Sequence, residues 1–306
     1  MDIDKPAALR ATFADVPRWH FGMLNDSVRN RQYRNAIAKK LPGLDVLDLG
    51  MGTGLLSMFA VRVGARHVYG CERNPAISSI ATEIVRANGE ASRVTVLGRS
   101  SHDLRIEQDI PKRLGGLVTE LMDCGMVGEG LLTSVSHARR HLLQDNARII
   151  PEQIEIEFCL IQSEQIFNNN HVEHVDDIDL STFNRYATPG YFPVRLRAWP
   201  FRYLSGRKSA LRFDLERGEI TAREELHEIT ATQPGIAHGI AFWFRAQLAP
   251  GIELSNDPQE STHWAQAIHC LERPQQVSRG ETIELRIATD LSKIEFTLSD
   301  RSSKHA

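Results

Sequence analysis

Two acidic residues nine positions apart, Glu120 and Glu129, are the clearest candidates for chemistry in this sequence. Glu120 ends an apolar run that predicts a strand over residues 117–120, and Glu129 opens a predicted helix over residues 129–143. A connection of this length lets both carboxylates point into one pocket, where they favour a delocalised cation with a fork of donors. Guanidinium is the obvious candidate. The alternative is a favourable acid in a first helical turn and an exposed strand end.

A glycine-rich turn predicts a nucleotide-cofactor site earlier in the chain. Residues 44–49 form a short apolar run typical of a buried parallel strand, and residues 55–63 follow helical spacing. Glycines between them let the backbone approach a ligand and present amides near a helix N-terminus. Glu72 ends the next predicted strand, 67–71, where a carboxylate can accept both hydroxyls of a ribose. An ordinary tight turn is the alternative. The residues of the turn assigned to the cofactor are Asp48, Gly50, Gly52 and Gly54.

The spacing of these glycines favours a particular class of cofactor. G-x-G-x-G differs from the G-x-G-x-x-G fingerprint that holds the pyrophosphate of a dinucleotide, and no P-loop lysine follows. An adenosyl cofactor without phosphates, S-adenosylmethionine, therefore fits better than NAD, which is the weaker alternative.

The elements around these motifs predict an α/β half followed by a half rich in strands. Helical and strand patterns alternate up to Pro151, which indicates a doubly wound sheet, and alternation typical of strands dominates after it. We place the domain boundary near Pro151. The further expected elements of the first half are helices over residues 24–40 and 75–87 and a strand over residues 93–97.

Composition excludes some classes of partner. At 306 residues and 42% hydrophobic, the chain can form two domains with sizeable cores. A net charge of −3 gives no general attraction to nucleic acid or anionic membranes, so neither is an expected partner. The sequence shows no amino-terminal signal and no apolar run of about 18 residues. The four cysteines are scattered. A cytoplasmic protein without a disulfide framework is expected.

A metal is not expected. His171 and His174 stand beside Asp176 and Asp177, which are possible ligand types, but they lie in a polar connecting segment and lack a complementary pair.

Taken together, the motifs resemble the protein arginine methyltransferases, a family of class I enzymes that use S-adenosylmethionine. Four separated motifs carry the resemblance and span most of residues 20–270: HFGMLNDSVRNRQY at 20–33, the glycine turn with Cys71-Glu72, TELMDCGMVGEGLL at 119–132 followed by SVSHAR, and Thr-His-Trp at 262–264. The acid loop is closer to the monomethylating type III branch than to dimethylating branches, whose loop usually reads SEWMGY. Ser100-Ser101, in the predicted adenine region, points the same way.

The resemblance implies roles for individual residues. Arg29 would pair with the carboxylate of the cofactor's methionine part, and Glu72 would hold its ribose. Glu120 and Glu129 would grip the substrate guanidinium. His263 would approach Asp26 from the second domain and close the site. The residues implied in the substrate pocket are Met23, Tyr33, Asp123 and Trp264, and those implied at the adenine are Ser100 and Ser101.

The resemblance also implies the architecture. A Rossmann-like methyltransferase domain with an N-terminal helical segment (residues 1–150) would be followed by a β-barrel-like substrate domain (151–306) with a short helical dimerisation arm, for which residues 176–192 are the candidate. Members of the family form head-to-tail rings in which this arm docks on the partner's cofactor domain. A homodimer is therefore expected.

Three functions stay open at this point. The first is methyl transfer to an ω-nitrogen of arginine, either in a peptide or as free L-arginine, with one methyl group expected from the resemblance. The second is methyl transfer to another small-molecule amine or alcohol, against which the paired acids and the Thr-His-Trp motif argue. The third is a non-catalytic scaffold that keeps the fold, but such a protein would tolerate losses at Arg29, Glu72, Glu120 or Glu129, and all four are present.

Overall fold

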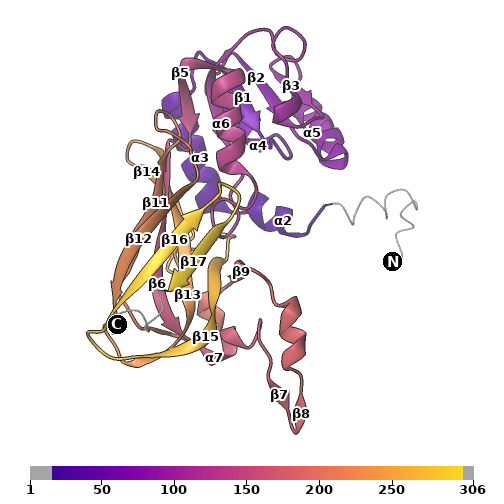
Figure 1. Cartoon of the computed structure of the whole chain (residues 1–306). Coiled ribbons are helices and arrows are strands. Elements are labelled where there is room, and N and C mark those ends of the chain that lie inside the picture. The colour runs from indigo at the N-terminus through magenta and orange to yellow at the C-terminus, as the bar shows by residue number, and fades with distance from the viewer. Residues whose placement is uncertain (1–15, 299–306) are drawn as a thin grey trace, which may run out of the picture.

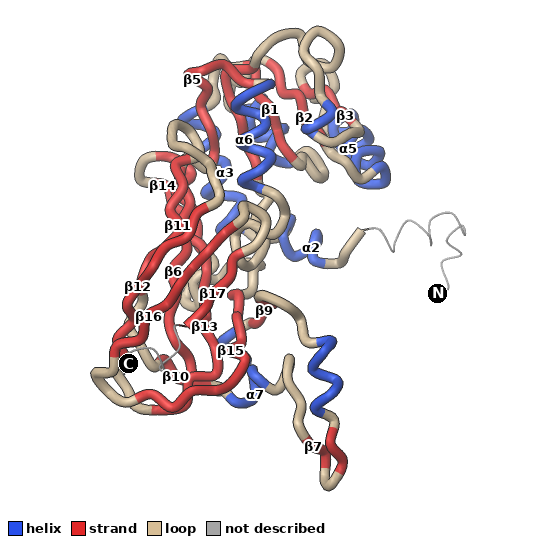
Figure 2. Tube along the Cα trace, viewed as in Figure 1, coloured by secondary structure: helices blue, strands red, loops and turns tan. Residues whose placement is uncertain are grey.

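A computed structural model describes residues 16–298 and places them in a parallel α/β domain followed by an elongated antiparallel domain (Figures 1 and 2). In Figure 1 the α/β domain lies at the top, the antiparallel sheets lie below it, and a slender hairpin projects from the lower end.

The first domain is built on a five-stranded sheet in which every neighbouring pair is parallel. Its chain order reverses between β1 and β4, so that the carboxyl ends of these two strands flank the crevice where open α/β sheets bind ligands. In spatial order the strands are β3 (Val94–Leu97), β2 (His67–Cys71), β1 (Asp45–Leu49), β4 (Leu114–Thr119) and β5 (Leu143–Ile150).

Helices cover the parallel sheet and follow local sequence signals. The helix α5 (Pro75–Ala87) has proline in its first turn, and the Asn74 side chain caps its first amides. The glycine turn leads directly into α4 (Leu55–Arg62). The short 3₁₀ helix η1 (Ser101–Asp103) follows β3. The prediction of residues 67–71 as a strand and 75–87 as a helix is confirmed to the residue.

The predicted helix over residues 24–40 is in fact two helices. The first, α2 (Trp19–Leu24), ends before Asn25, and the second, α3 (Ser27–Lys40), begins after Asp26. Asp26 has an extended backbone and caps α3, because its Oδ1 accepts the Arg29 amide at 2.9 Å. This break turns the start of α3 toward the crevice. The same helix contacts β13 (Gly235–Ala249) and β14 (Ile252–Ser255) of the second domain.

The prediction for residues 129–143 was wrong at both ends. The helix α6 spans Leu131–His141, and the strand β5 starts two residues after it. Gly130 adopts a left-handed backbone with φ of 83°, so the helix cannot extend back to Glu129, which lies in the preceding loop. The strand β5 was not predicted because residues 144–146 are polar and exposed and interrupt its apolar pattern.

Up to residue 298 the second domain holds two larger antiparallel sheets and a separate two-stranded hairpin. The large sheet is centred on the long strand β13, and Phe296 of the small sheet packs on its residue Phe242 with ring centroids 4.9 Å apart. The large sheet contains β6 (Gln153–Gln162), β9 (Tyr191–Val194), β10 (Arg202–Tyr203), β11 (Lys208–Asp214), β13 (Gly235–Ala249), β14 (Ile252–Ser255) and β15 (Gln266–Val277); the small sheet contains β12 (Arg223–Thr230), β16 (Thr282–Thr289) and β17 (Ile294–Leu298).

The expected barrel does not close over residues 16–298. The small sheet shares no strand ladder with the large one, so the domain is two packed sheets. Since β5 ends at Ile150 and β6 begins at Gln153, the change from parallel to antiparallel sheet supports the proposed boundary near Pro151.

The candidate arm starts earlier than expected and is mostly not helical. It consists of a hairpin of β7 (His174–Val175) and β8 (Ile178–Asp179), a 3₁₀ helix η2 (Ser181–Tyr186), and the return through β9. Short helices flank it: α7 (Glu164–Phe167) before the arm and η3 (Leu196–Ala198) after it. The hairpin projects away from both sheets (Figure 1).

None of the helices that the structure describes is both long enough and apolar enough to cross a membrane.

Candidate functional site

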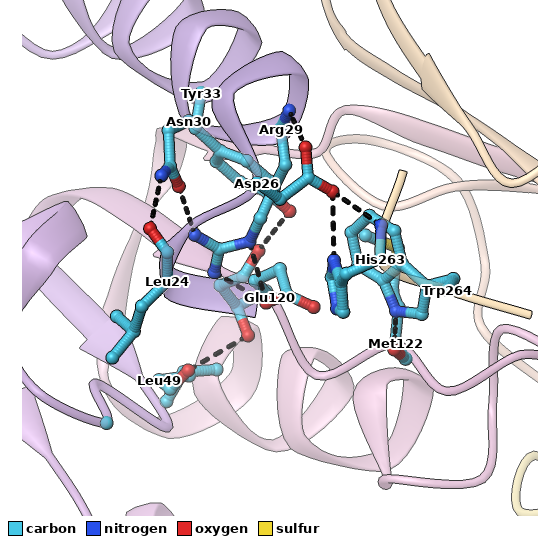
Figure 3. A network of polar contacts seen from close by, with 12 residues as sticks. Leu24, Asp26, Arg29, Asn30, Tyr33, Leu49, Glu120, Met122, His263 and Trp264 are labelled. Atoms are coloured by element: carbon cyan, nitrogen blue, oxygen red, sulfur yellow. Dashed lines mark hydrogen bonds and ion pairs between the residues drawn. The ribbon is translucent and has the colours of Figure 1, made fainter. Parts of the chain in front are cut away.

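A buried ion pair between Arg29 and Glu120 lies at the centre of the crevice (Figure 3). Glu120 follows β4, and Arg29 lies in the first turn of α3, which the Asp26 cap orients toward it. Arg29 donates from Nε at 3.1 Å and from Nη2 at 2.5 Å, both to Glu120 Oε2. Its Nη1 donates to Asn30 Oδ1 at 2.8 Å. Glu120 is therefore held on one oxygen, and its Oε1 is left for another cation.

A second pair joins the two domains. The Oδ2 atom of Asp26 accepts the backbone amide of His263 at 2.8 Å, and His263 Nδ1 lies 3.0 Å from the same oxygen (Figure 3). Burial alone would raise the pKa of Asp26, but hydrogen bonds from the His263 side chain and from the backbone amides of Arg29 and His263 outweigh it, and the pKa is lowered. The second domain thus contacts the start of α3 through these two residues, a contact that the family resemblance implied.

Trp264 holds the acid loop, residues 121–130, against the second domain. Its indole Nε1 donates to the Met122 carbonyl oxygen at 2.7 Å, and its ring is buried against that of His263, with centroids 3.9 Å apart. Trp264, which the resemblance implied in the substrate pocket, anchors the loop that carries Glu129.

Glu129 lies at the rim of the site and keeps exposed surface. Among residues 16–298 its carboxylate has no hydrogen-bond or ion-pair partner at close range, and the positive charge of Arg73 attracts it only from a distance. Desolvation by the surrounding protein nevertheless raises the pKa of Glu129 to about 7, and the negative charges of Glu120 and Asp123 add to this effect. The negative charge gathered around Glu129 makes a site that a cation would stabilise.

Asp123 was expected beside the substrate, and in the structure its carboxylate holds the acid loop in shape. Its Oδ1 accepts the amides of Gly125 at 3.2 Å and Gly128 at 3.0 Å, and its Oδ2 accepts the Tyr191 hydroxyl at 2.8 Å. Burial raises the pKa of Asp123, whereas these hydrogen bonds oppose the shift. Asp123 adds negative charge near Glu129 while its own oxygens are occupied.

The glycine turn and Glu72 fit an adenosyl ligand. Glu72 Oε2 accepts the Gly52 amide at 3.2 Å, and Oε1 accepts the Asn74 amide at 2.8 Å. A carboxylate has about four lone-pair positions, so acceptor capacity remains for two ribose hydroxyls. Gly52 has φ of 53°, and a Cβ added there would meet nothing within 4 Å. The turn therefore presents open backbone to a ligand.

Asp48 lies beneath this turn and is buried. It accepts a hydrogen bond from the Ser57 hydroxyl at 2.6 Å, which ties β1 to α4. Burial raises the pKa of Asp48 to about 7. The structure thus places Asp48 as a brace of the turn rather than on its open side.

The other predicted site residues flank this centre. Tyr33 is fully buried, and its hydroxyl donates to the Thr119 carbonyl oxygen at 2.9 Å, so its contact is with the strand that ends at Glu120. Met23, on α2, is half-buried. Ser101 is buried in η1, and Ser100 caps that turn by accepting the His102 amide at 3.3 Å.

Two residues of the site were missed in the sequence, Tyr191 and Asn256. Tyr191 belongs to the return strand of the arm, a segment with a poor motif match. Asn256 stands six positions before Thr262, and its only signal was that proximity. Among residues 16–298 no group of three or more His, Cys, Asp or Glu side chains is arranged to hold a metal ion.

The fold and the site define a class of enzyme: a Rossmann-like methyltransferase whose paired acids face the cofactor crevice. Comparisons with known proteins show which family of methyltransferases the chain belongs to. The sequence profile of the arginine methyltransferase oligomerization subdomain matches residues 154–302, and that of ribosomal protein L11 methyltransferase (PrmA) matches residues 34–113. The Arginine N(omega)-methyltransferase of Streptomyces achromogenes subsp. streptozoticus is 39% identical, over 94% of this chain and 80% of that protein. The chain belongs to the arginine methyltransferase family, and S-adenosylmethionine is its cofactor.

Other relatives are longer or more distant. Protein arginine N-methyltransferase 9 of Homo sapiens is 32% identical over 83% of this chain, and the match spans 34% of that protein. Among solved structures, the Trypanosoma brucei PRMT1 enzyme-prozyme heterotetrameric complex with AdoHcy aligns with a TM-score of 0.79 at 22% identity, covering 94% of this chain and 96% of that one. Protein arginine methyltransferase 10 of Arabidopsis thaliana aligns with a TM-score of 0.72 at 21% identity, covering 88% and 86%. At these identities the likeness concerns the fold.

Proposed function

We propose that this protein transfers one methyl group to an ω-nitrogen of arginine. The observation that carries the proposal is that one crevice holds two acids, of which one is restrained by an ion pair and the other is not. Glu120 is fixed on one oxygen by Arg29, and Glu129 has no partner among the described residues and a raised pKa. Such a pair suits a cation that offers several N–H donors in a plane.

The chemistry follows from charge and orientation. A guanidinium is a poor nucleophile because its lone pairs are delocalised over three nitrogens. When bound, S-adenosylmethionine supplies an electrophilic methyl group on a sulfonium. Hydrogen bonds from Glu120 and Glu129 to the guanidinium hold its charge away from the attacking nitrogen and align that nitrogen with the methyl carbon. With the cofactor bound, the transfer would form a nitrogen–carbon bond while the carbon–sulfur bond of the sulfonium would break.

Arg29 and Glu72 suit the two ends of the cofactor. Three donors of Arg29 are used by Glu120 and Asn30, and a guanidinium has five, so donors remain for the carboxylate of the methionine part. Glu72 keeps acceptor capacity for the ribose. Both assignments are proposals.

Glu129 is the proposed acceptor of the proton that leaves the methylated nitrogen. A group with a pKa of about 7 exchanges a proton readily near neutral pH. Asp26 is less suited, since its pKa is lowered and its Oδ2 is occupied by His263.

Free L-arginine is the proposed acceptor molecule. The support is the Streptomyces relative, which is 39% identical over almost the whole chain and whose name, unlike that of the protein 9 relatives, does not specify a protein substrate. The expectation of a single methyl group rests on the likeness of the acid loop to the monomethylating branch.

Label transfer from S-adenosylmethionine tests the acceptor. Free L-arginine and an arginine-rich peptide are offered separately at equal arginine concentration, and the products are separated by mass. We expect one methyl on free arginine. Labelling of the peptide alone would move the proposal to protein substrates, and labelling of neither would overturn it.

A second copy of this chain is the proposed partner of the arm. The arm exposes apolar side chains that find no cover in one chain: Phe183 is 67% and Tyr186 82% exposed. The matched profile of residues 154–302 describes an oligomerization subdomain, which supports this proposal.

A further inference from the structure

Asn256 is a fully buried amide in the loop after β14. Its Oδ1 accepts the Phe244 amide of β13 at 2.7 Å. Its Nδ2 donates to the Ala265 carbonyl oxygen at 2.7 Å and to the Cys124 carbonyl oxygen at 3.0 Å. One side chain therefore joins the large sheet, the segment that carries His263 and Trp264, and the middle of the acid loop.

The chemistry of these partners selects an amide. The Phe244 partner is a donor, whereas both other partners are acceptors, so the side chain must accept at one terminal atom and donate twice at the other. An aspartate of the same shape would place an oxygen against two carbonyl oxygens. A hydroxyl is too short to serve all three partners.

The loop that Asn256 holds carries the acid with the raised pKa. Cys124 lies between Glu120 and Glu129, and the neighbouring Met122 carbonyl is held by Trp264 at 2.7 Å. Both anchors come from residues 256–265 of the second domain. The same segment places the His263 amide on Asp26, at the start of the helix that carries Arg29. This segment therefore contacts both sides of the crevice, but the Asn256 side chain itself bonds only the side formed by the acid loop.

Glu120 has a direct restraint of its own from Arg29, whereas Glu129 has none among the described residues. Its position depends on the backbone of the acid loop, and Asn256 is the buried side chain that ties the middle of that backbone to the sheet.

We propose that Asn256 is a positioning residue for methyl transfer: it fixes the acid loop on the Thr-His-Trp segment and thereby sets the alignment of Glu129 with the acceptor nitrogen. This rests on the function proposed above. The hydrogen bonds of the Asn256 side chain go to Phe244, Cys124 and Ala265, and none of them goes to Glu72, Arg29 or the glycine turn. Its loss should therefore reduce kcat and leave cofactor affinity unchanged.

The test compares Asn256→Asp with Thr289→Val. Thr289 is also buried and bonds two backbone groups, the Lys293 carbonyl and the Leu291 amide, but it lies in the small sheet away from the crevice. Thermal melting, S-adenosylmethionine affinity by calorimetry, steady-state kinetics with arginine, and hydrogen exchange of residues 121–130 are measured for both variants and the wild type. Asn256→Ser, which removes the three hydrogen bonds without bringing a charge into the buried site, is carried through the same measurements in case the aspartate variant does not fold.

We expect both variants to melt at lower temperature and to bind the cofactor within about twofold of the wild type. The Asn256 variant should lose at least about tenfold in kcat and exchange faster in the acid loop, because displacements of about 1 Å cost rates of this order. Thr289→Val should keep the wild-type kcat and the wild-type rate of exchange in the acid loop. Equal kcat in the two variants, or unchanged exchange in the loop, would overturn the proposal. A wild type that methylates no arginine would refute the proposed function instead, and the exchange measurement would still decide whether Asn256 holds the loop.

Discussion

Arg29 donates two hydrogen bonds to a single oxygen of Glu120, although the two residues lie 91 positions apart in the chain. Both side chains are buried, with 4% and 6% of their surface exposed. A charge pair removed from water contributes stability only while both partners are present. This pair therefore fixes the acid in place and makes the start of α3 part of the site.

Replacement of Arg29 by methionine should destabilise the fold, because it leaves Glu120 buried without its cation. We expect a loss of about 3–5 kcal/mol in the free energy of unfolding, measured by urea titration. The matched variant is Arg29→Met with Glu120→Gln, which removes both charges. It should recover most of the loss, and a double variant as unstable as the single one would contradict the ion-pair account.

Catalytic efficiency should depend on pH through the ionisation of Glu129. Desolvation and neighbouring acids raise its pKa to about 7, and a guanidinium binds only the ionised form. We therefore expect kcat/KM to rise about tenfold per pH unit below that value and to level off above it. Asp123→Asn removes a nearby charge and keeps an acceptor for the loop amides, so its profile should shift to lower pH. An unshifted profile would mean that another group titrates.

Asp26 should contribute to catalysis separately from its capping of α3. Asparagine also caps helices well, whereas alanine loses the cap at a cost of about 1 kcal/mol. We expect Asp26→Asn to keep the melting temperature within a few degrees yet lower kcat, because its charge no longer holds His263. Asp26→Ala should lose stability as well. Full activity in the asparagine variant would remove the Asp26–His263 pair from the mechanism.

The buried carboxyl of Asp48 should make stability fall as the pH rises. Burial raises its pKa from 3.8 to about 7, so the folded protein holds this proton more tightly than the unfolded chain. That contribution is fully present below the unfolded pKa and is lost as the pH rises through 7. Asp48→Asn keeps an acceptor for Ser57 and does not ionise. Unfolding in urea at about pH 5 and about pH 8 should show a smaller decrease for the variant than for the wild type; identical decreases would contradict this.

The arm should hold two copies together. Phe183→Asp places a charge on its exposed apolar surface and should convert a dimer into a monomer of 34.4 kDa, measured by light scattering. Leu226→Asp is the matched control, since Leu226 is equally exposed, at 67%, but lies on β12. A wild type that is monomeric at micromolar concentration would refute the proposed homodimer.

The sequence was most informative where local signals coincide. Pro75 at a helix start with Asn74 before it, and an apolar run bounded by glycine, each have one compatible structure, and these elements were predicted to within a residue or two. The acids and their family motif also identified the crevice.

Prediction from the sequence failed where the conformation depends on one torsion angle or on contacts between residues far apart in the chain. The left-handed Gly130 separates Glu129 from α6, and helical periodicity cannot reveal that. The pairing of Arg29 with Glu120 and the three bonds of Asn256 join residues far apart in sequence, so only the folded chain shows them. Whether a barrel-like domain closes depends on ladders between non-neighbouring strands, so the sequence predicted the β-rich domain but not that its two larger sheets stay open over residues 16–298.

The most direct test of the acid-pair mechanism is turnover by Glu129→Gln compared with the wild type. Glutamine keeps the shape of the side chain, but it carries no negative charge and cannot accept the proton. We predict that S-adenosylmethionine affinity, measured by calorimetry, changes less than about twofold and that kcat for arginine methylation falls by about 100-fold or more. A variant that retains wild-type kcat would contradict the central role of Glu129.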